Sequence, residues 1–316
     1  VNAIPEEVQI EAGKLLFITT PAIPATHPHI IHLKEAGHKP IKRSEFLGQI
    51  TKNKPTLAVA GTHGKTTITA LLAHIVAGTE NGCNAFIGGV SANTKSNFYW
   101  SSKAKWTVVE ADEFDRSFHS LSPTHAVITS LDPDHLDIYG NHDNMKKVFT
   151  QFSQLVTHKT VVAQGIDLGD FTYGISEETS YGVKNIRLSD QGYHFDLVTP
   201  KETHEDIYLN AIGQHNLSNA IGALAIVDVA GFPLADALPA LENFGGIHRR
   251  MEVFSFGNKT VIDDYAHHPE EIKAVLKTVA EFYPDKKNMV VFQPHLFSRT
   301  QDFMDAFAQV LDQFDE

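Results

Sequence analysis

The sequence has almost no cysteine: Cys83 is the single one among 316 residues. One thiol cannot close a disulfide within the chain, and it cannot form the paired-cysteine clusters that hold structural zinc. Disulfides are typical of oxidising compartments, so this composition suits a reducing environment instead. We therefore predict a cytoplasmic protein.

The sequence also lacks any apolar run near the ~20 residues that a membrane-spanning helix needs, and it lacks the charged and then apolar layout of a secretory signal. Basic residues are in deficit, because 26 Lys and Arg stand against 38 Asp and Glu, for a net charge of −12. Nucleic acids and anionic membranes attract basic surfaces. We therefore predict neither a nucleic acid nor a membrane as partner, and any bound anion must be held by a local site.

What remains is an ordinary globular composition. Apolar residues make up 42% of the chain and charged residues 20%, which excludes disordered, collagen-like and coiled-coil classes. At ~100–200 residues per domain, the length predicts two or three domains. Because the chain starts at Val1 and the final helical pattern has no later strand to pack against, we interpret both ends as truncated.

Short apolar strands alternate with amphipathic helices from residue 55 onwards. The predicted strand 56–60 leads into a glycine turn and then into a helix whose apolar residues recur with helical spacing between Ile68 and Val76. Further strands are predicted at 107–109, 126–129 and 160–162. This alternation indicates an α/β fold with a mostly parallel sheet, and such sheets bind ligands at the carboxyl ends of their strands.

Two later regions have a different pattern. Residues 171–210 carry short Tyr-, Thr- and Val-rich runs that predict an antiparallel excursion beside the main sheet, followed by a helix at 217–230. A third region begins near residue 248. It predicts, in order, a strand at 260–262, a helix at 270–282, a strand at 289–292 and a helix at 301–314.

The strongest chemical signal is the segment GTHGKTT between the first predicted strand and helix. Its residues are Gly61, Thr62, His63, Gly64, Lys65, Thr66 and Thr67. Backbone N–H groups of a glycine turn at a helix start can surround a polyphosphate, while Lys65 supplies positive charge and the Thr66 hydroxyl can bind Mg²⁺. The first glycine stands three residues before the second, which departs from the common GxxxxGK[ST] spacing. A helix-capping turn with a chance lysine is the alternative.

Polar clusters follow two other predicted strands. Residues 110–113 contain three acids, including Glu110, and residues 132–137 contain three acids and His135. Mg²⁺ binds one or two carboxylates together with phosphates and water, and a histidine can bind a metal or a phosphate. A solvated acidic loop and a structural histidine are the alternatives.

Polar residues that suit a nucleotide and a carboxylate follow later in the chain. Asn216 and Asn219 share a helix face and can recognise the edge of adenine, although Asn216 is equally well explained as a helix N-cap. Asp264 follows a predicted strand, where an acid can bind ribose hydroxyls. The remaining candidates are Arg250, as a phosphate or carboxylate clamp, and His267 and Arg299, as groups that hold a carboxylate or stabilise developing negative charge.

Seven segments together resemble the Mur ligases of peptidoglycan synthesis. In chain order they read GTHGKTT, EADE, DPDHLDIYG, GQHNLSNA, HRRMEVF, DDYAHHPEEI and FQPHLFSRT, and the resemblance runs from about residue 20 to residue 316. It implies three domains: a Rossmann-like domain for a UDP-sugar, a central P-loop ATPase domain with a parallel sheet, and a Rossmann-like C-terminal domain for an amino acid. We expect them at 1–54, 55–247 and 248–316, the first and last being partial.

The resemblance implies an ATP-dependent ligase that joins L-alanine to the carboxylate of UDP-N-acetylmuramate through an acyl phosphate. Activation is needed because a carboxylate repels nucleophiles and offers a poor leaving group, whereas phosphate leaves readily. ATP and Mg²⁺ are then the cofactors, and we expect a monomer or weak homodimer. Two alternatives stay open: a recycling ligase that adds a ready-made tripeptide, and a nucleotide-binding module without turnover.

The resemblance also implies roles for single residues. By motif, the catalytic residues are Lys65, Arg250 and His267, and the Mg²⁺ ligands are Thr66, Glu110 and His135. In the nucleotide site, adenine is contacted by Asn216 and Asn219, ribose by Asp264 and phosphate by Arg250. The amino-acid pocket is formed by Tyr265, His267 and Arg299. The chain departs from many relatives at Leu296, where they carry an arginine suited to the amino-acid carboxylate.

Overall fold

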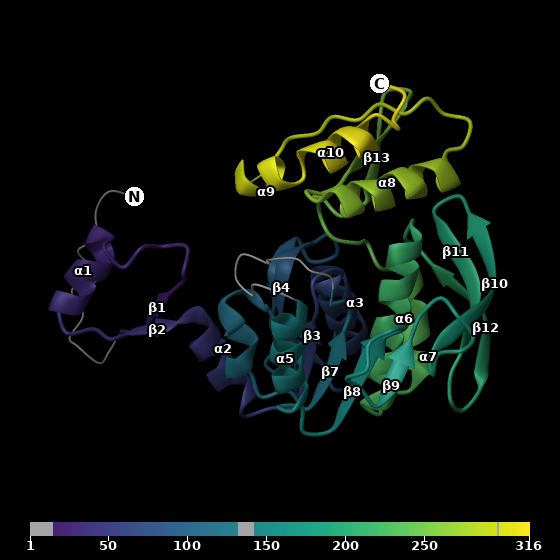
Figure 1. Cartoon of the computed structure of the whole chain (residues 1–316). Coiled ribbons are helices and arrows are strands. Elements are labelled where there is room, and N and C mark those ends of the chain that lie inside the picture. The colour runs from purple at the N-terminus through teal and green to yellow at the C-terminus, as the bar shows by residue number, and fades with distance from the viewer. Residues whose placement is uncertain (1–14, 132–141, 296) are drawn as a thin grey trace.

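The computed structural model describes residues 15–131, 142–295 and 297–316. These residues form an α/β structure around one large sheet, with a small N-terminal unit beside it and a mainly helical C-terminal region above it (Figure 1). Among the described residues, no helix combines the length and the apolar character needed to cross a bilayer.

The central sheet carries the strands that the alternating pattern predicts. Its strands are β3 (Thr56–Ala60), β4 (Cys83–Ser91), β5 (Ser96–Tyr99), β6 (Trp106–Glu110), β7 (His125–Ile128), β8 (Lys159–Ala163) and β9 (Phe171–Tyr173). They lie in the order β5-β4-β6-β3-β7-β8-β9. Neighbours are parallel except for β4 and β5, which confirms the predicted α/β class.

Helices cover both faces of this sheet. One layer consists of α3 (Lys65–Ala77), α6 (Gln214–Val229) and α7 (Leu234–Glu242), and the other of α2 (Arg43–Thr51), η2 (Phe114–Ser120) and α5 (His142–Ser153). Alternate residues of a strand face opposite sides, so Leu57 and Val59 pack in the first layer whereas Ala58 and Ala60 pack in the second. All of β3 is buried, which explains why this central strand is apolar throughout.

The antiparallel excursion predicted for 171–210 is confirmed only from residue 182 onwards, because residues 171–173 form β9, which pairs in parallel with β8 in the main sheet. Its strands β10 (Gly182–Ser189), β11 (Gly192–Val198) and β12 (Thr203–Leu209) form a separate three-stranded antiparallel sheet. Tyr193, Phe195 and Leu197 of β11 are buried in the same core as α6, so this small sheet packs against the main body rather than standing apart.

Smaller units lie at the two ends of the described chain. The first contains β1 (Phe17–Thr19) and β2 (Pro40–Lys42), which pair in parallel, and α1 (Pro28–Glu35). The last contains the antiparallel pair β13 (Glu252–Phe256) and β14 (Lys259–Asp263), and the helices α8 (Pro269–Phe282), α9 (Phe297–Asp302) and α10 (Met304–Leu311).

Two predicted elements of the last unit are wrong. Residues 289–292 form no strand, and the backbone N–H of Val290 instead donates to the carbonyl of Glu316 (2.9 Å). Val291 is 88% exposed, so its apolar character does not reflect a core position. The helix predicted at 301–314 is divided at Phe303 into α9 and α10.

A buried histidine lies at the amino end of β7, on the sheet edge opposite the glycine turn. The ring of His125 lies between those of Trp106 and His158, with centroids 6.0 and 5.1 Å away. Burial, helped by the nearby charge of His158, lowers the pKa of His125 to about 4. The folded protein therefore keeps this imidazole neutral.

We predict that the free energy of unfolding falls as the pH drops from about 6.5 towards about 4, because the unfolded chain binds a proton that the folded His125 excludes. The loss for this residue is on the order of 3 kcal/mol. Urea unfolding across this pH range should show a shallower decline for His125→Gln, and no such change for His32→Gln, whose histidine is exposed. Equal slopes for His125→Gln and the wild type would contradict the prediction.

Candidate active site at the phosphate loop

The segment between β3 and α3 is a tight turn that requires glycine at two positions. Gly61 and Gly64 have φ of +131° and +77°, values that other residues rarely adopt. A Cβ on Gly61 would lie 2.1 Å from Oγ1 of Thr129, and one on Gly64 would lie 2.5 Å from Oδ1 of Asn219. The two glycines therefore provide both the backbone shape and the room for its neighbours. We call residues Gly61–Thr67 the phosphate loop.

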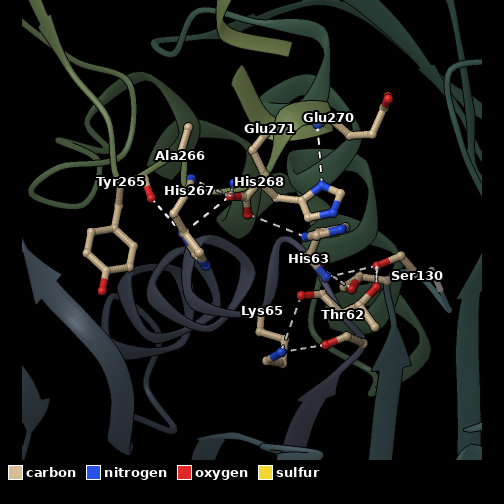
Figure 2. Close-up of polar contacts among 12 residues, drawn as sticks. Thr62, His63, Lys65, Ser130, Tyr265, Ala266, His267, His268, Glu270 and Glu271 are labelled. Atoms are coloured by element: carbon tan, nitrogen blue, oxygen red, sulfur yellow. Dashed lines mark hydrogen bonds and ion pairs between the residues drawn. The ribbon is translucent and has the colours of Figure 1, made fainter. Parts of the chain in front are cut away.

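Residues just beyond β7 hold the phosphate loop in place. The Ser130 hydroxyl lies 2.8 Å from that of Thr62 and accepts a hydrogen bond from the backbone N–H of His63 (2.9 Å), and the Thr129 hydroxyl donates to the His63 carbonyl (Figure 2). Sequence reasoning missed Ser130. Its signal was its place directly after a predicted strand, at the same sheet edge as the loop.

A buried ion pair involves the lysine of the loop. The Lys65 ammonium donates to the Gly61 carbonyl (2.6 Å) and lies 2.9 and 2.8 Å from the two carboxylate oxygens of Glu113. The side chains of Lys65 and Glu113 are only 13% and 2% exposed. Glu113 belongs to the predicted acidic cluster, but here it neutralises the lysine.

The predicted magnesium ligands Thr66 and Glu110 lie together. The Thr66 hydroxyl donates to one Glu110 oxygen (3.2 Å), and the backbone N–H of Gly88 donates to the other (2.8 Å). Burial raises the pKa of Glu110, although Lys65 and these two hydrogen bonds oppose the shift. A hydroxyl and a carboxylate beside a phosphate loop fit Mg²⁺, which fills its other positions with phosphate and water. His135 lies outside the described residues, as does Leu296.

Within the described ranges, no group of three or more His, Cys, Asp or Glu side chains is placed to hold a metal ion by itself.

A cavity of about 600 Å³ opens beside the phosphate loop. Predicted site residues from separate segments line it, namely His63, Gly64, Thr67, Asn216, Asn219, Arg250 and Asp264. Its volume falls in the usual range for small-molecule sites. The structure thus brings the predicted phosphate, adenine and ribose residues to one place, while their individual roles stay predictions.

Two lining residues also have structural partners. The Asn216 amide donates to the Ile212 carbonyl (2.8 Å), and the N-cap of α6 is Gly213, so the N-cap interpretation of Asn216 is wrong. Asp264 accepts hydrogen bonds from the backbone N–H groups of Met251 (2.8 Å) and Ala266 (2.7 Å). Burial raises the pKa of Asp264 against the effect of these bonds.

The predicted amino-acid residues Tyr265 and His267 lie next to the cavity. The guanidinium groups of Arg249 and Arg250 lie 5.2 and 5.4 Å from the centre of the Tyr265 ring, within cation–π range. The ring nitrogen Nδ1 of His267 donates to the Tyr265 carbonyl (2.8 Å). Arg299 lies on α9, and its role in the pocket stays a prediction.

One contact joins the phosphate loop to the C-terminal region. Nδ1 of His63 lies 3.5 Å from Glu271, which is in the first turn of α8, and the Glu271 carboxylate lies between the rings of His63 and His267 (Figure 2). Sequence reasoning missed this pair because nothing in local spacing links residues so far apart in the chain.

Replacing Ser130 with alanine should weaken nucleotide binding, because the His63 amide and the Thr62 hydroxyl each lose one of the bonds that hold the loop. One such hydrogen bond contributes about 1 kcal/mol, so we expect a rise of about fivefold in the Kd for ATP. Calorimetric titration measures it. Ser153→Ala, which removes a hydroxyl that bonds within α5, is the control, and equal Kd values for both variants would refute the role of Ser130.

Two family models match the chain. The Mur ligase middle domain matches residues 59–227, and the Mur ligase, glutamate ligase domain matches residues 249–316. The first match alone covers more than half of the 316 residues.

Known proteins match over nearly the whole chain. The UDP-N-acetylmuramate--L-alanine ligases of Christiangramia forsetii and Flavobacterium johnsoniae are 45% and 44% identical to it, over 100% of this chain and 70% of each relative. The chain therefore spans about 70% of the length of these relatives.

Solved structures of Mur ligases also resemble the chain. The crystal structure of UDP-N-acetylmuramate-alanine ligase from Thermotoga maritima has a TM-score of 0.84 at 31% identity, over 95% of this chain and 70% of that one. The UDP-N-acetylmuramate:L-alanyl-gamma-D-glutamyl-meso-diaminopimelate ligase from Neisseria meningitides reaches 0.65 at 21% identity, over 74% of this chain and 80% of that one, which is a likeness of fold alone. By its sequence identity and by the family model that spans more than half of it, the chain belongs to the Mur ligase family.

Proposed function

We propose that this chain carries out the ATP-dependent joining of L-alanine to UDP-N-acetylmuramate, a step in the synthesis of peptidoglycan precursors. The observation that carries this function is identity of 44–45% over the whole chain to ligases named for that reaction, combined with a phosphate loop whose lysine, hydroxyl and acid lie together at one sheet edge.

The chemistry follows from the charges at the site. Phosphorylation of the muramate carboxylate turns a poor leaving group into a good one, and the amine of L-alanine then displaces phosphate to form the amide. Lys65 and Arg250 are suited to stabilise charge on the transferred phosphoryl group. Mg²⁺, when bound through Thr66 and Glu110, would neutralise further phosphate charge. Tyr265 and His267 would border the amino acid.

The wider setting of the enzyme is also a proposal. We infer that the chain contains a partial UDP-sugar domain (1–54), a central ATPase domain (55–247) and a partial amino-acid domain (248–316), and the family models that end at 227 and begin at 249 support the second limit. A cytoplasmic location and a monomer or weak homodimer remain expectations that rest on composition and family.

Two alternatives are less well supported. A ligase for a ready-made tripeptide shares the fold, but two solved ligases of that type are 21% and 24% identical, against 31% for the L-alanine ligase. A nucleotide-binding module without turnover could use Lys65, Thr66 and Glu110 in the same way to bind a nucleotide with Mg²⁺, so it is the identity to named ligases that favours turnover.

Phosphate release by the full-length gene product tests the function. We predict release only when ATP, UDP-N-acetylmuramate and L-alanine are all present, with the L-alanine reaction favoured over the tripeptide reaction by at least about a hundredfold in kcat/KM, because a pocket built for a small amino acid excludes a larger one. Lys65→Ala serves as the inactive control. Preference for the tripeptide would overturn the substrate assignment, and release without any acceptor would overturn the ligase.

Replacing Glu110 with glutamine should raise the Mg²⁺ concentration needed for half-maximal activity by on the order of tenfold, because the amide keeps the size of the side chain but loses the charge that a hard cation prefers. A Mg²⁺ titration of phosphate release measures this shift. Glu178→Gln, at an exposed position, is the matched control. If both variants titrate like the wild type, Glu110 is not a magnesium ligand.

A further inference from the structure

Helix α8 is attached to the central domain at both ends. Near its C-terminus, Glu281 accepts a hydrogen bond from the hydroxyl of Tyr193 (2.9 Å), and the Phe282 ring packs edge-on against the Tyr193 ring at 5.3 Å. At its N-terminus, Glu271 lies over the phosphate loop. The contact near the C-terminus joins α8 to the small antiparallel sheet, whereas the contact at the N-terminus joins α8 to the phosphate loop. Only the second contact therefore acts directly on the loop.

Glu271 first of all caps its own helix. Its carboxylate accepts hydrogen bonds from the backbone N–H groups of His267 (2.8 Å) and His268 (3.2 Å), which completes a capping box. Such boxes occur in many helices and need nothing beyond the backbone. Capping alone therefore does not explain the side-chain contacts of Glu271.

Two imidazole rings from different regions of the chain contact the same carboxylate. Nδ1 of His63, on the phosphate loop, lies 3.5 Å from Oε1, and Nδ1 of His267, just before α8, lies 3.3 Å from Oε2. The Glu271 side chain is 20% exposed. Figure 2 shows the carboxylate between the two rings. Glu271 is thus a direct physical link between the loop and the predicted amino-acid pocket.

The carboxylate carries a charge. Burial alone would raise the pKa of Glu271, but the hydrogen bonds from His63 and from the His267 backbone, together with the two imidazoles, lower it to about 2. A fixed negative charge favours N–H donors on the ring atoms that face it.

This charge also sets the orientation of His267. Its Nδ1 donates to the Tyr265 carbonyl (2.8 Å) and faces Glu271, so the proton is held on Nδ1. The other ring nitrogen, Nε2, points away from Glu271 (Figure 2). A carboxylate that fixes the tautomer of a histidine in this way is a known device of active sites.

We propose that Glu271 is a positioning residue that couples the phosphate loop to the amino-acid site. By contacting both His63 and His267, it holds the His267 ring at a fixed position relative to the phosphate bound in the loop. This inference rests on the proposed function. Removal of either the carboxylate charge or the His63 ring then disturbs the same property, the affinity for L-alanine, although His63 lies on the nucleotide side.

The test is a double-mutant cycle on the full-length gene product at saturating ATP and UDP-N-acetylmuramate. Glu271→Gln keeps an oxygen for the backbone cap but loses the charge, and His63→Asn leaves α8 unchanged. We expect each variant to raise the KM for L-alanine by about tenfold, the value of a hydrogen bond to a charged group. The double variant should be no worse than the worse single variant, because both remove one interaction.

Glu281→Gln is the matched control, since it weakens the other attachment of the same helix without touching the loop. It should lower the melting temperature but leave the KM for L-alanine unchanged. The proposal fails if His63→Asn has a normal KM for L-alanine, if the two effects multiply, or if Glu281→Gln raises that KM as much as Glu271→Gln. Failure of the wild type to use L-alanine would instead refute the proposed function.

Discussion

The parallel pairing of β3 with β7 is the constraint on which the rest of the site depends. Ala60 is aligned with Ile128, so the residues that follow each strand emerge side by side. Thr129 and Ser130 therefore reach the phosphate loop and bond to its backbone and side chains. The glycines allow this close approach, because any side chain on Gly61 would collide with Thr129. Loop shape is thus a property of two neighbouring strands and not of one local motif.

The same principle brings the acids to the loop. Because β6 lies on the other side of β3, with Glu110 aligned with Val59, the acidic segment emerges beside Lys65 and Thr66. One acid then meets the hydroxyl and another meets the ammonium. The C-terminal region adds Glu271, in the first turn of α8, which contacts His63 of the loop. A protein with a net charge of −12 can bind a polyphosphate because these backbone and side-chain groups are concentrated at one sheet edge.

Much of this arrangement was predictable from the sequence, for a physical reason. Parallel strands place their carboxyl ends at one edge, so the phosphate loop and Glu110, which follow β3 and β6, could be expected to converge. Asp264 follows β14, which belongs to a separate antiparallel pair, so its place at the cavity depends on how the C-terminal region packs and not on the parallel sheet. What could not be predicted depends on tertiary neighbours: the Ser130 bonds, the pairing of Lys65 with Glu113, and the contact of His63 with Glu271. The strand expected at 289–292 did not form, because a run of apolar residues makes a strand only where it pairs in a ladder, and the backbone N–H of Val290 bonds to Glu316 instead.

The ion pair between Lys65 and Glu113 means that the resting loop already carries its own counter-ion. An incoming nucleotide does not meet an unpaired positive charge. Its phosphate has to replace the buried Glu113 carboxylate as the partner of Lys65. Several linked phosphate groups, which also gain the loop amides, compete in this exchange far better than a single inorganic anion does. We therefore expect the site to favour ligands that present several negative charges at once, whatever their base or sugar.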